Sequence, residues 1–198
     1  MAWAKNGTPD TLSSSGDTIS ISDLIAKTFN QIMWHALDTG GSIRSAIEFN
    51  NDTSSVYATR RSSNGAADVT GTSQANLIAA QDETSEHFGI AYIVSISGKE
   101  KLVISNSVQG STAEATTAPL RQEQVGKYVP SPDADITRID IENNQAGSYD
   151  TNSNLSALSG NVTKEVMLGN NVQSGSRFEA TDTRKIYYSN GTSWTEEA

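Results

Sequence analysis

Residues 87–108, HFGIAYIVSISGKEKLVISNSV, carry the clearest β-hairpin signal in this chain. Every second residue of the first half is large and apolar, namely Phe88, Ile90, Tyr92, Val94 and Ile96. A polar turn at residues 97–100 follows, and Leu102 and Ile104 resume the alternation. A period of two is typical of a β-strand, so this stretch predicts two antiparallel strands. Val103 interrupts the second alternation, and we therefore expect both faces of the pair to be partly covered.

Shorter strand-like runs lie on either side of this hairpin. They are separated by clusters of Gly, Asn, Ser or Pro and occupy residues 18–21, 42–50, 56–61, 121–129 and 135–143. Seven to nine short strands spaced about ten residues apart are typical of a sandwich or jelly roll and not of βαβ units. The predicted fold class is therefore mainly β, a single antiparallel, jelly-roll-like β-sandwich.

Residues 23–37 allow two interpretations. Leu24, Phe29, Ile32, Met33 and Trp34 fit one face of a helix that Asp23 would cap. The segment 29–37 fits a bulged strand equally well, and both alternatives stay open at this point.

The chain divides into four expected parts. Residues 1–17 are polar and rich in turn formers, which predicts an extended N-terminal arm before the sandwich domain at 18–160. Residues 161–176 resemble a linker in composition. Residues 177–198 form a C-terminal hairpin module, because the aromatic runs 186–188 and 193–195 flank the turn sequence Ser-Asn-Gly-Thr. An isolated hairpin is marginally stable, so its aromatic side is expected to need a covering surface.

Composition excludes several classes of function. The 198 residues include 27 Ser, 20 Thr and 15 Asn, and they carry a formal charge of −9 with a pI of about 4.6. An acidic chain lacks the basic surface that binds phosphates, so no nucleic-acid partner is expected. The absence of Cys excludes disulfides, thiolate chemistry and most zinc sites. No apolar run resembles a signal peptide or a membrane span, so we expect a soluble chain that is made in a cytoplasm and does not insert into membranes.

Residues for catalysis are sparse. His35 and His87 are the only histidines, and no nucleophile elbow accompanies them, so we interpret both as structural or surface residues in preference to a histidine-pair metal site. Glu48 and Glu100 are the only candidates for the paired carboxylates of a glycosidase, and neither stands out from its surroundings. The sequence therefore predicts a non-enzymatic protein without catalytic residues and without a required cofactor.

Calcium is the one metal that the sequence admits. Asp52 follows Asn50 and Asn51, and Asp133 and Asp135 lie two residues apart, so hard oxygen ligands occur in two tight loops. The same residues are typical of Asx turns that cap strands, and this is the favoured interpretation.

Two further features suggest contacts with other proteins. Arg60 and Arg61 form a basic pair at a strand end, which fits either an acidic partner or a solvated edge that blocks strand pairing. Trp3 lies in the polar arm without an obvious core to enter, and such a residue can anchor a neighbouring subunit.

The C-terminal stretch RFEATDTRKIYYSNGTSWTE, residues 177–196, resembles a short terminal module of structural proteins from tailed bacteriophages. The shared pattern is Phe-Glu, Asp-Thr, Lys-Ile-Tyr, then Gly and Trp, over about 20 residues. Residues 49–57 and 60–68 look like parts of jelly-roll domains in marine viral structural proteins.

The resemblance implies a virion protein, made in the host cytoplasm and exposed on the particle as a capsid decoration or tail accessory protein. Its partners would be other virion proteins and further copies of itself, with a homotrimer as the habit of the family. The expected contact residues are Trp3, Arg60, Arg61, Tyr187, Tyr188 and Trp194. The alternative is a head of a tail fibre or spike that binds a host receptor or glycan through loops 50–55, 62–73 and 110–118, with Tyr57 as the nearest aromatic.

Overall fold

The computed structural model describes residues 3–81, 83–110, 115–131, 134–160, 175, 177–180, 185–189 and 194–196. Every regular element among them is a β-strand and every pairing is antiparallel. In this described part of the chain, no helix is long and apolar enough to cross a membrane. The chain separates into a body, residues 3–160, and a C-terminal unit that begins at residue 161.

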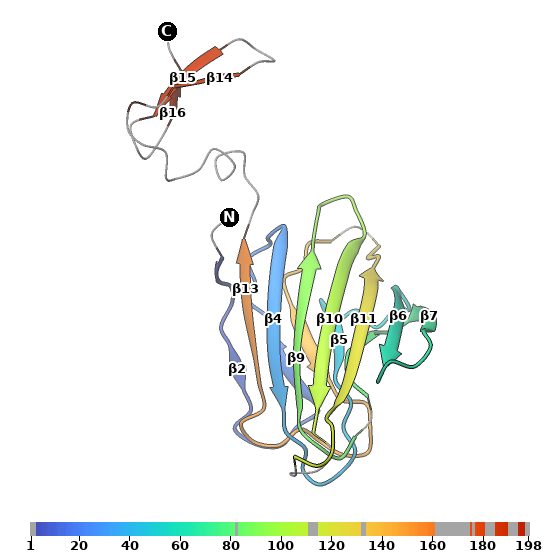
Figure 1. Cartoon of the computed structure of the whole chain (residues 1–198). Coiled ribbons are helices and arrows are strands. Elements are labelled where there is room, and N and C mark those ends of the chain that lie inside the picture. Colours follow the sequence, from blue (N-terminus) through green and yellow to red (C-terminus); the bar gives the residue numbers. More distant parts are fainter. Residues whose placement is uncertain are drawn as a thin grey trace. The chain divides into compact units, whose positions relative to one another are not determined.

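The body contains two sheets (Figure 1). The large sheet has nine strands in the order β1-β13-β4-β9-β10-β11-β6-β7, with β2 also paired to β13. Its strands are β1 (Ala4–Lys5), β2 (Asp10–Thr11), β4 (Phe29–Ala36), β6 (Tyr57–Ser63), β7 (Val69–Gln74), β9 (His87–Val94), β10 (Lys101–Gln109), β11 (Leu120–Tyr128) and β13 (Asn154–Gly160). The small sheet has the order β3-β12-β5-β8 and contains β3 (Thr18–Ile21), β12 (Ile139–Glu142), β5 (Ala46–Phe49) and β8 (Leu77–Ile78).

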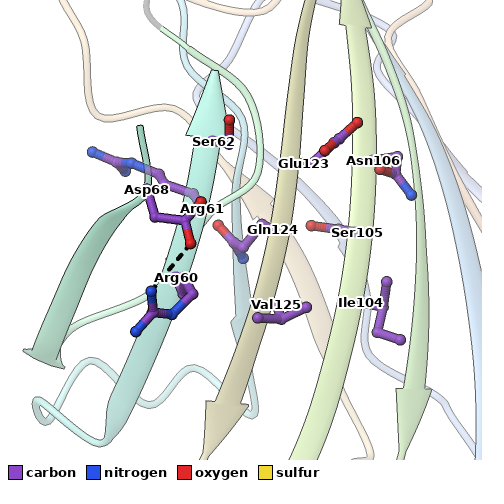
Figure 2. Close-up of a pocket in the computed structure, with 10 residues that line it drawn as sticks. All are labelled: Arg60, Arg61, Ser62, Asp68, Ile104, Ser105, Asn106, Glu123, Gln124 and Val125. Atoms are coloured by element: carbon purple, nitrogen blue, oxygen red, sulfur yellow. Dashed lines mark hydrogen bonds and ion pairs between the residues drawn. The ribbon is translucent and has the colours of Figure 1, made fainter. Parts of the chain in front are cut away.

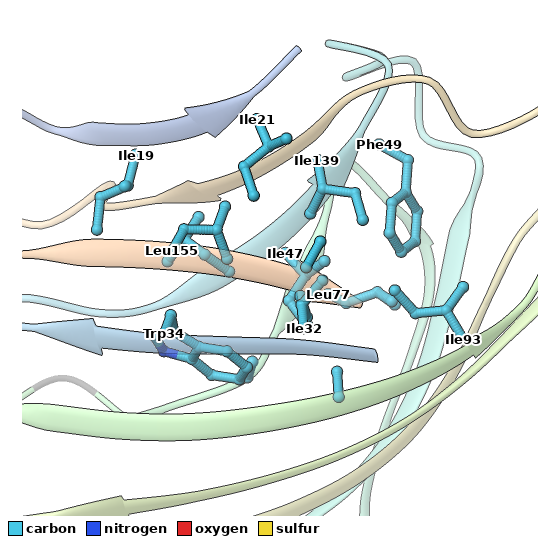
Figure 3. Close-up of a cluster of buried hydrophobic side chains, with 14 of the residues drawn as sticks. Ile19, Ile21, Ile32, Trp34, Ile47, Phe49, Leu77, Ile93, Ile139 and Leu155 are labelled. Carbon is cyan, nitrogen blue, oxygen red and sulfur yellow. The ribbon is translucent and has the colours of Figure 1, made fainter. Parts of the chain in front are cut away.

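The core lies between these sheets, which confirms the predicted antiparallel β-sandwich (Figure 3). The small sheet contributes the inward residues of β3, β5 and β12, and the large sheet contributes mainly those of β4, β9 and β13. The fully or almost fully buried members include Ile19, Ile21, Ile47, Phe49, Ile139, Ile32, Trp34, Ile93 and Leu155. Burial of such side chains contributes about 2 kcal/mol each, so this cluster is the main source of stability.

The segment 29–36 is a strand and not a helix. Ile32, Trp34 and Ala36 are buried while Met33 is exposed, which is the period of two of a sheet with one face inward. β4 pairs with β13 on one side and β9 on the other, and these two neighbours supply the backbone partners that a helix would have found within itself.

The predicted N-terminal arm is extended and bound to the sheet edge. β1 and β2 both pair with β13. Between them, the buried side chain of Asn6 donates to the carbonyl of Ile25 and accepts from its N–H, each at 2.9 Å. These bonds hold the arm in place along the body.

The predicted hairpin 87–108 is present as β9 and β10, with Tyr92 opposite Ile104 and Phe88 opposite Val108. Its polarity is unusual, because the buried side chains of β10 beside Val103 are Lys101, Ser105, Ser107 and Gln109. The apolar residues Leu102, Ile104 and Val108 point outward. β11 continues the pattern with Gln122 and Gln124 inside and Val125 outside.

The C-terminal unit is a three-stranded sheet of β14 (Arg177–Ala180), β15 (Lys185–Ser189) and β16 (Trp194–Glu196). The predicted hairpin corresponds to β15 and β16, with Ser189 opposite Trp194. β14 adds a third strand to it through the pairing of Phe178 with Tyr187.

Candidate functional site

The exposed side of the large sheet carries many exposed apolar side chains. Seven large apolar side chains there are between 37 and 55 % exposed: Met33, Phe88, Tyr92, Leu102, Ile104, Val108 and Val125. We call these seven residues the outer apolar face. They lie on four adjacent strands, β4, β9, β10 and β11. Contiguous exposed apolar patches of this kind mark interaction sites on soluble proteins.

The strand register brings the members of this surface together. Tyr92, Ile104 and Val125 lie opposite one another across β9, β10 and β11, and Arg60 of β6 continues the same row. Directly opposite residues in a sheet have Cβ atoms about 5 Å apart, so their side chains form one surface.

A hollow of about 590 Å³ opens on this surface where β6 and β7 adjoin it. Tyr92, Leu102, Ile104 and Val125 line it from the outer apolar face, and Thr70 and Thr72 line it from β7. A hollow of this size accepts several side chains of a partner or one small molecule.

A second hollow of about 270 Å³ lies beside the first (Figure 2). It is lined by Arg60, Arg61, Asp68, Ser105 and Glu123, among others. The predicted basic pair is therefore at this surface, with Nη1 of Arg60 3.1 Å from Oδ2 of Asp68. Arg61 alternates with Arg60 and also lines a third hollow with Arg44, Gln81 and Gln122.

Ion pairs surround the outer apolar face, and Glu86 beside His35 adds one further carboxylate. Three ion pairs border it: Arg60 with Asp68 at 3.1 Å, Arg121 with Glu123 at 3.0 Å and Lys127 with Glu100 at 2.8 Å. Each pair is about half exposed, so each contributes little to stability. Together they add no net charge, although the whole chain carries −9.

The two loops that were expected to admit calcium are used for internal hydrogen bonds. Asp52 accepts from the backbone N–H of Ser54 at 3.0 Å and from Oη of Tyr128 at 3.1 Å. The hydroxyl of Ser54 also donates to Asp52, and these bonds lower the pKa of its carboxyl. The contact with the Ser54 N–H is an Asx turn. Asn50 donates to the carbonyl of Asp135 at 2.8 Å, which ties the two loops together.

No cluster of three potential metal-ligating side chains occurs among the described residues. Asp133 lies outside them, so the second loop is described only from residue 134 onward.

The two histidines lie on opposite sides of the large sheet. His35 is partly exposed, and its Nε2 is 3.1 Å from Oε2 of Glu86. His87 is buried, with Nδ1 3.1 Å from Oγ of Ser45, and burial lowers its pKa to about 4. The register places Ala36, not His35, opposite His87. The geometry therefore does not bring the two imidazoles to a common metal.

Glu48 is a buried carboxyl on β5, directly opposite Asp140 of β12. Burial raises its pKa to about 8, and the charges of Glu142 and Asp140 act in the same direction. Arg138 and Ser20 are bonded to Asp140, with Nε of Arg138 2.7 Å from Oδ2. Glu100, the other glycosidase candidate, lies at the β9–β10 turn of the other sheet and pairs with Lys127.

The predicted contact residues near the two ends of the chain are among the described residues: Trp3, Tyr187, Tyr188 and Trp194. Trp3 precedes β1 and is 42 % exposed, and Tyr188 of β15 is 41 % exposed. Oη of Tyr187 is 3.5 Å from Oε2 of Glu196 on the neighbouring strand β16. Trp194 lies on β16, with Ser189 as its backbone partner.

Tyr57, the aromatic expected near a glycan-binding loop, is buried. Its hydroxyl accepts from the N–H of Phe49 at 2.9 Å, and its ring stacks on Tyr128 with 4.9 Å between centroids. Tyr92 is an exposed aromatic on the outward side of the large sheet, and its place in the sequence predicted only that it lies on a strand. The sequence shows the polar alternation Lys101, Ser105, Ser107 and Gln109 on β10, and the structure shows that this polar side is the inward one.

No protein-family model matches this chain, and no match was found among curated proteins or solved structures.

Proposed function

We propose that this chain is a non-enzymatic structural protein of a virus particle, exposed as a capsid decoration or tail accessory protein. In this proposal it acts by contact with other protein subunits, and the outer apolar face is the contact surface. The observation that carries the proposal is the exposure of seven large apolar side chains on one face of a folded sandwich. The resemblance of residues 177–196 to the terminal module of phage structural proteins supplies the viral context.

The polarity of the β10–β11 pair supports a contact role over an ordinary solvated face. Sheets with one side in water usually place polar residues outward. Here Ile104 and Val125 are outward while Ser105 and Gln124 are buried. A second surface that removes the outward apolar groups from water would therefore stabilise this arrangement.

Immunogold electron microscopy of purified particles, with antibodies against this chain, tests the proposal. Gold over the heads supports capsid decoration, and gold at the tails supports a tail accessory role. Particles without gold, in a preparation whose lysate contains the chain, would overturn the virion assignment. Antibodies that recognise the denatured chain on a blot of the same particles exclude a masked epitope.

A glycan-binding head is the second candidate, and the exposed ring of Tyr92 is the observation that favours it. Tyr92 lines the 590 Å³ hollow together with Arg60 and Thr70. Aromatic rings beside polar hydrogen-bonding groups can hold sugar rings, because the ring offers an apolar body to the sugar face. A glycan array with and without calcium tests this role. Binding that Tyr92→Ala abolishes and Tyr188→Ala retains supports it, and an array without hits contradicts it.

A further inference from the structure

We propose that the outer apolar face is covered by the same face of a second copy of this chain, so that two large sheets pack against each other in a two-fold dimer. This inference deepens the proposed function and uses the same surface. It names the occupant as the chain itself.

β10 and β11 have their polar side chains inward and their apolar side chains outward. The hydroxyl of Ser107 donates to the carbonyl of Ala79 at 2.7 Å, and Nε2 of Gln109 donates to the carbonyl of Gln81 at 3.0 Å. These bonds fix the polar side of the strands inward. The apolar residues of the same strands then necessarily point outward, because successive side chains alternate across a strand.

The exposed face of the large sheet is about as large as a protein–protein interface. Six strands, from β13 to β6, are placed side by side over about eight residues. With standard strand spacing and rise, they span a projected area of roughly 750 Å². A stable protein–protein interface buries about 800 Å² per partner. The whole sheet face, which includes the outer apolar face and its two flanking strands, is therefore close to the size of a specific dimer interface.

The charges around the outer apolar face also favour a second copy as the partner. Two copies that each carry −9 repel each other over most of their surfaces. At the outer apolar face the three bordering ion pairs cancel, and Glu86 beside His35 adds one carboxylate, so two copies meet less repulsion here than the charge of −9 implies for the whole chain. A basic partner would find an excess of only this one carboxylate. The small excess of charge on an acidic chain thus favours a second copy over a partner chosen by opposite charge.

The shape of the face also suits an isologous contact. In a two-fold dimer the same patch serves both copies, so the patch has to provide both raised and hollowed parts. Phe88 and Val108 lie opposite each other at one end of β9 and β10, and the 590 Å³ hollow lies around Leu102 at the other end. Sheets packed face to face interdigitate their side chains in this manner.

The mass of the full chain in solution tests the dimer. Light scattering coupled to size exclusion, at protein concentrations from about 1 to 100 μM, should give twice the chain mass of 21.1 kDa. Ile104→Glu places a carboxylate from each copy inside the interface and should raise the dissociation constant by at least about 100-fold. A circular dichroism spectrum and an unfolding midpoint like those of the parent chain show that the variant is folded.

Ile25→Glu is the matched control. Ile25 is 66 % exposed in the loop between β3 and β4, outside the outer apolar face, so this variant should remain a dimer. A parent chain that stays monomeric at 100 μM, a mass of three copies, or a dimer that a folded Ile104→Glu variant retains would overturn the proposal. If Ile104→Glu does not fold, Val125→Lys is judged by the same criteria, and the concentration dependence of the parent mass still decides.

The outcomes separate this inference from the proposed function. A monomeric chain that labels virus particles overturns the dimer and leaves the virion role intact. A dimer that never occurs on particles supports the self-association and overturns the virion role.

Discussion

Gly89 has no side chain because the indole of Trp34 occupies the space beside it. The two residues are direct partners across β4 and β9, and Trp34 is buried. A Cβ at position 89 would lie 2.0 Å from Cζ2 of Trp34, which is far inside van der Waals contact. Gly89 is therefore part of the packing of the largest side chain in the core.

Gly89→Ala should lower the free energy of unfolding by about 3 kcal/mol, the upper part of the range for overpacked cores. Urea titration followed by tryptophan fluorescence measures the change. Gly16→Ala is the control, since a Cβ there meets nothing within 4 Å, and it should change stability by less than about 0.5 kcal/mol. Equal effects of the two substitutions would contradict the steric explanation.

Glu48 makes stability depend on pH in a direction opposite to most carboxylates. Its ordinary pKa is 4.5, and burial raises it to about 8 in the folded chain. Between these values the folded chain holds a proton that the unfolded chain releases. The free energy of unfolding therefore falls as the pH rises from about 4.5 to 8.

Glu48→Gln removes this titration and keeps the size and shape of the side chain. We expect its melting temperature to exceed that of the parent chain by about 3 °C or more at pH 8, and the difference to shrink at pH 5. Calorimetry at both pH values measures it. Glu100→Gln, which changes an exposed carboxylate, should show no such dependence. A larger advantage of Glu48→Gln at pH 5 than at pH 8 would refute the argument.

At the scale of the elements, the β10–β11 pair combines satisfied and unsatisfied buried amides. Nε2 of Gln122 donates to the carbonyl of Ile78. Neither polar atom of the buried Gln124 side chain finds a hydrogen-bond partner among the described residues. A buried amide without a hydrogen-bond partner lowers the free energy of unfolding, because nothing compensates for its removal from water. An apolar side chain of similar size at the same place avoids this cost.

Gln124→Leu should therefore raise the free energy of unfolding by about 1 kcal/mol, whereas Gln122→Leu should lower it by a similar amount. Both are measured by denaturant titration of the two variants in parallel. A loss of stability in Gln124→Leu would mean that ordered water in the adjacent hollow satisfies this amide, since Gln124 lines that hollow.

The strands were largely predictable because their signals are local. The alternation in residues 87–108 and the Asn-Gly turn of the C-terminal module need no knowledge of distant contacts. Residues 29–36 were ambiguous, because β13, which settles them as a strand, is more than a hundred residues away in sequence. The outer apolar face was missed for another reason. An alternating strand does not reveal which side is inward, and on β10 the carbonyls of residues 79 and 81 decide it.

At the scale of the whole molecule, the body contains its entire hydrophobic core within residues 12–157. The residues before this range nevertheless stabilise the body through the backbone pairing of β1 and β2 and through Asn6. β1 and β2 both pair with β13, and this attachment gives the N-terminal residues a stabilising role.

Removal of residues 161–198 should leave the melting temperature of the body within about 2 °C, whereas removal of residues 1–11 should cost more than about 2 kcal/mol. The second deletion exposes the β13 edge and removes both bonds from Asn6 to Ile25. Thermal melts of the two shortened chains beside the full chain measure the contrast. A body that unfolds equally early after either deletion would contradict it.

The antiparallel pairing of β1 with β13 has a mechanical consequence. Ala4 lies opposite Ser159 and Lys5 opposite Leu158, so the body begins and ends at neighbouring points (Figure 1). A force applied at these two points acts across the strands. It breaks the hydrogen bonds between β1 and β13 one after another and does not load all of them at once. β1 should therefore detach from β13 at low force, before the force acts on the sandwich core.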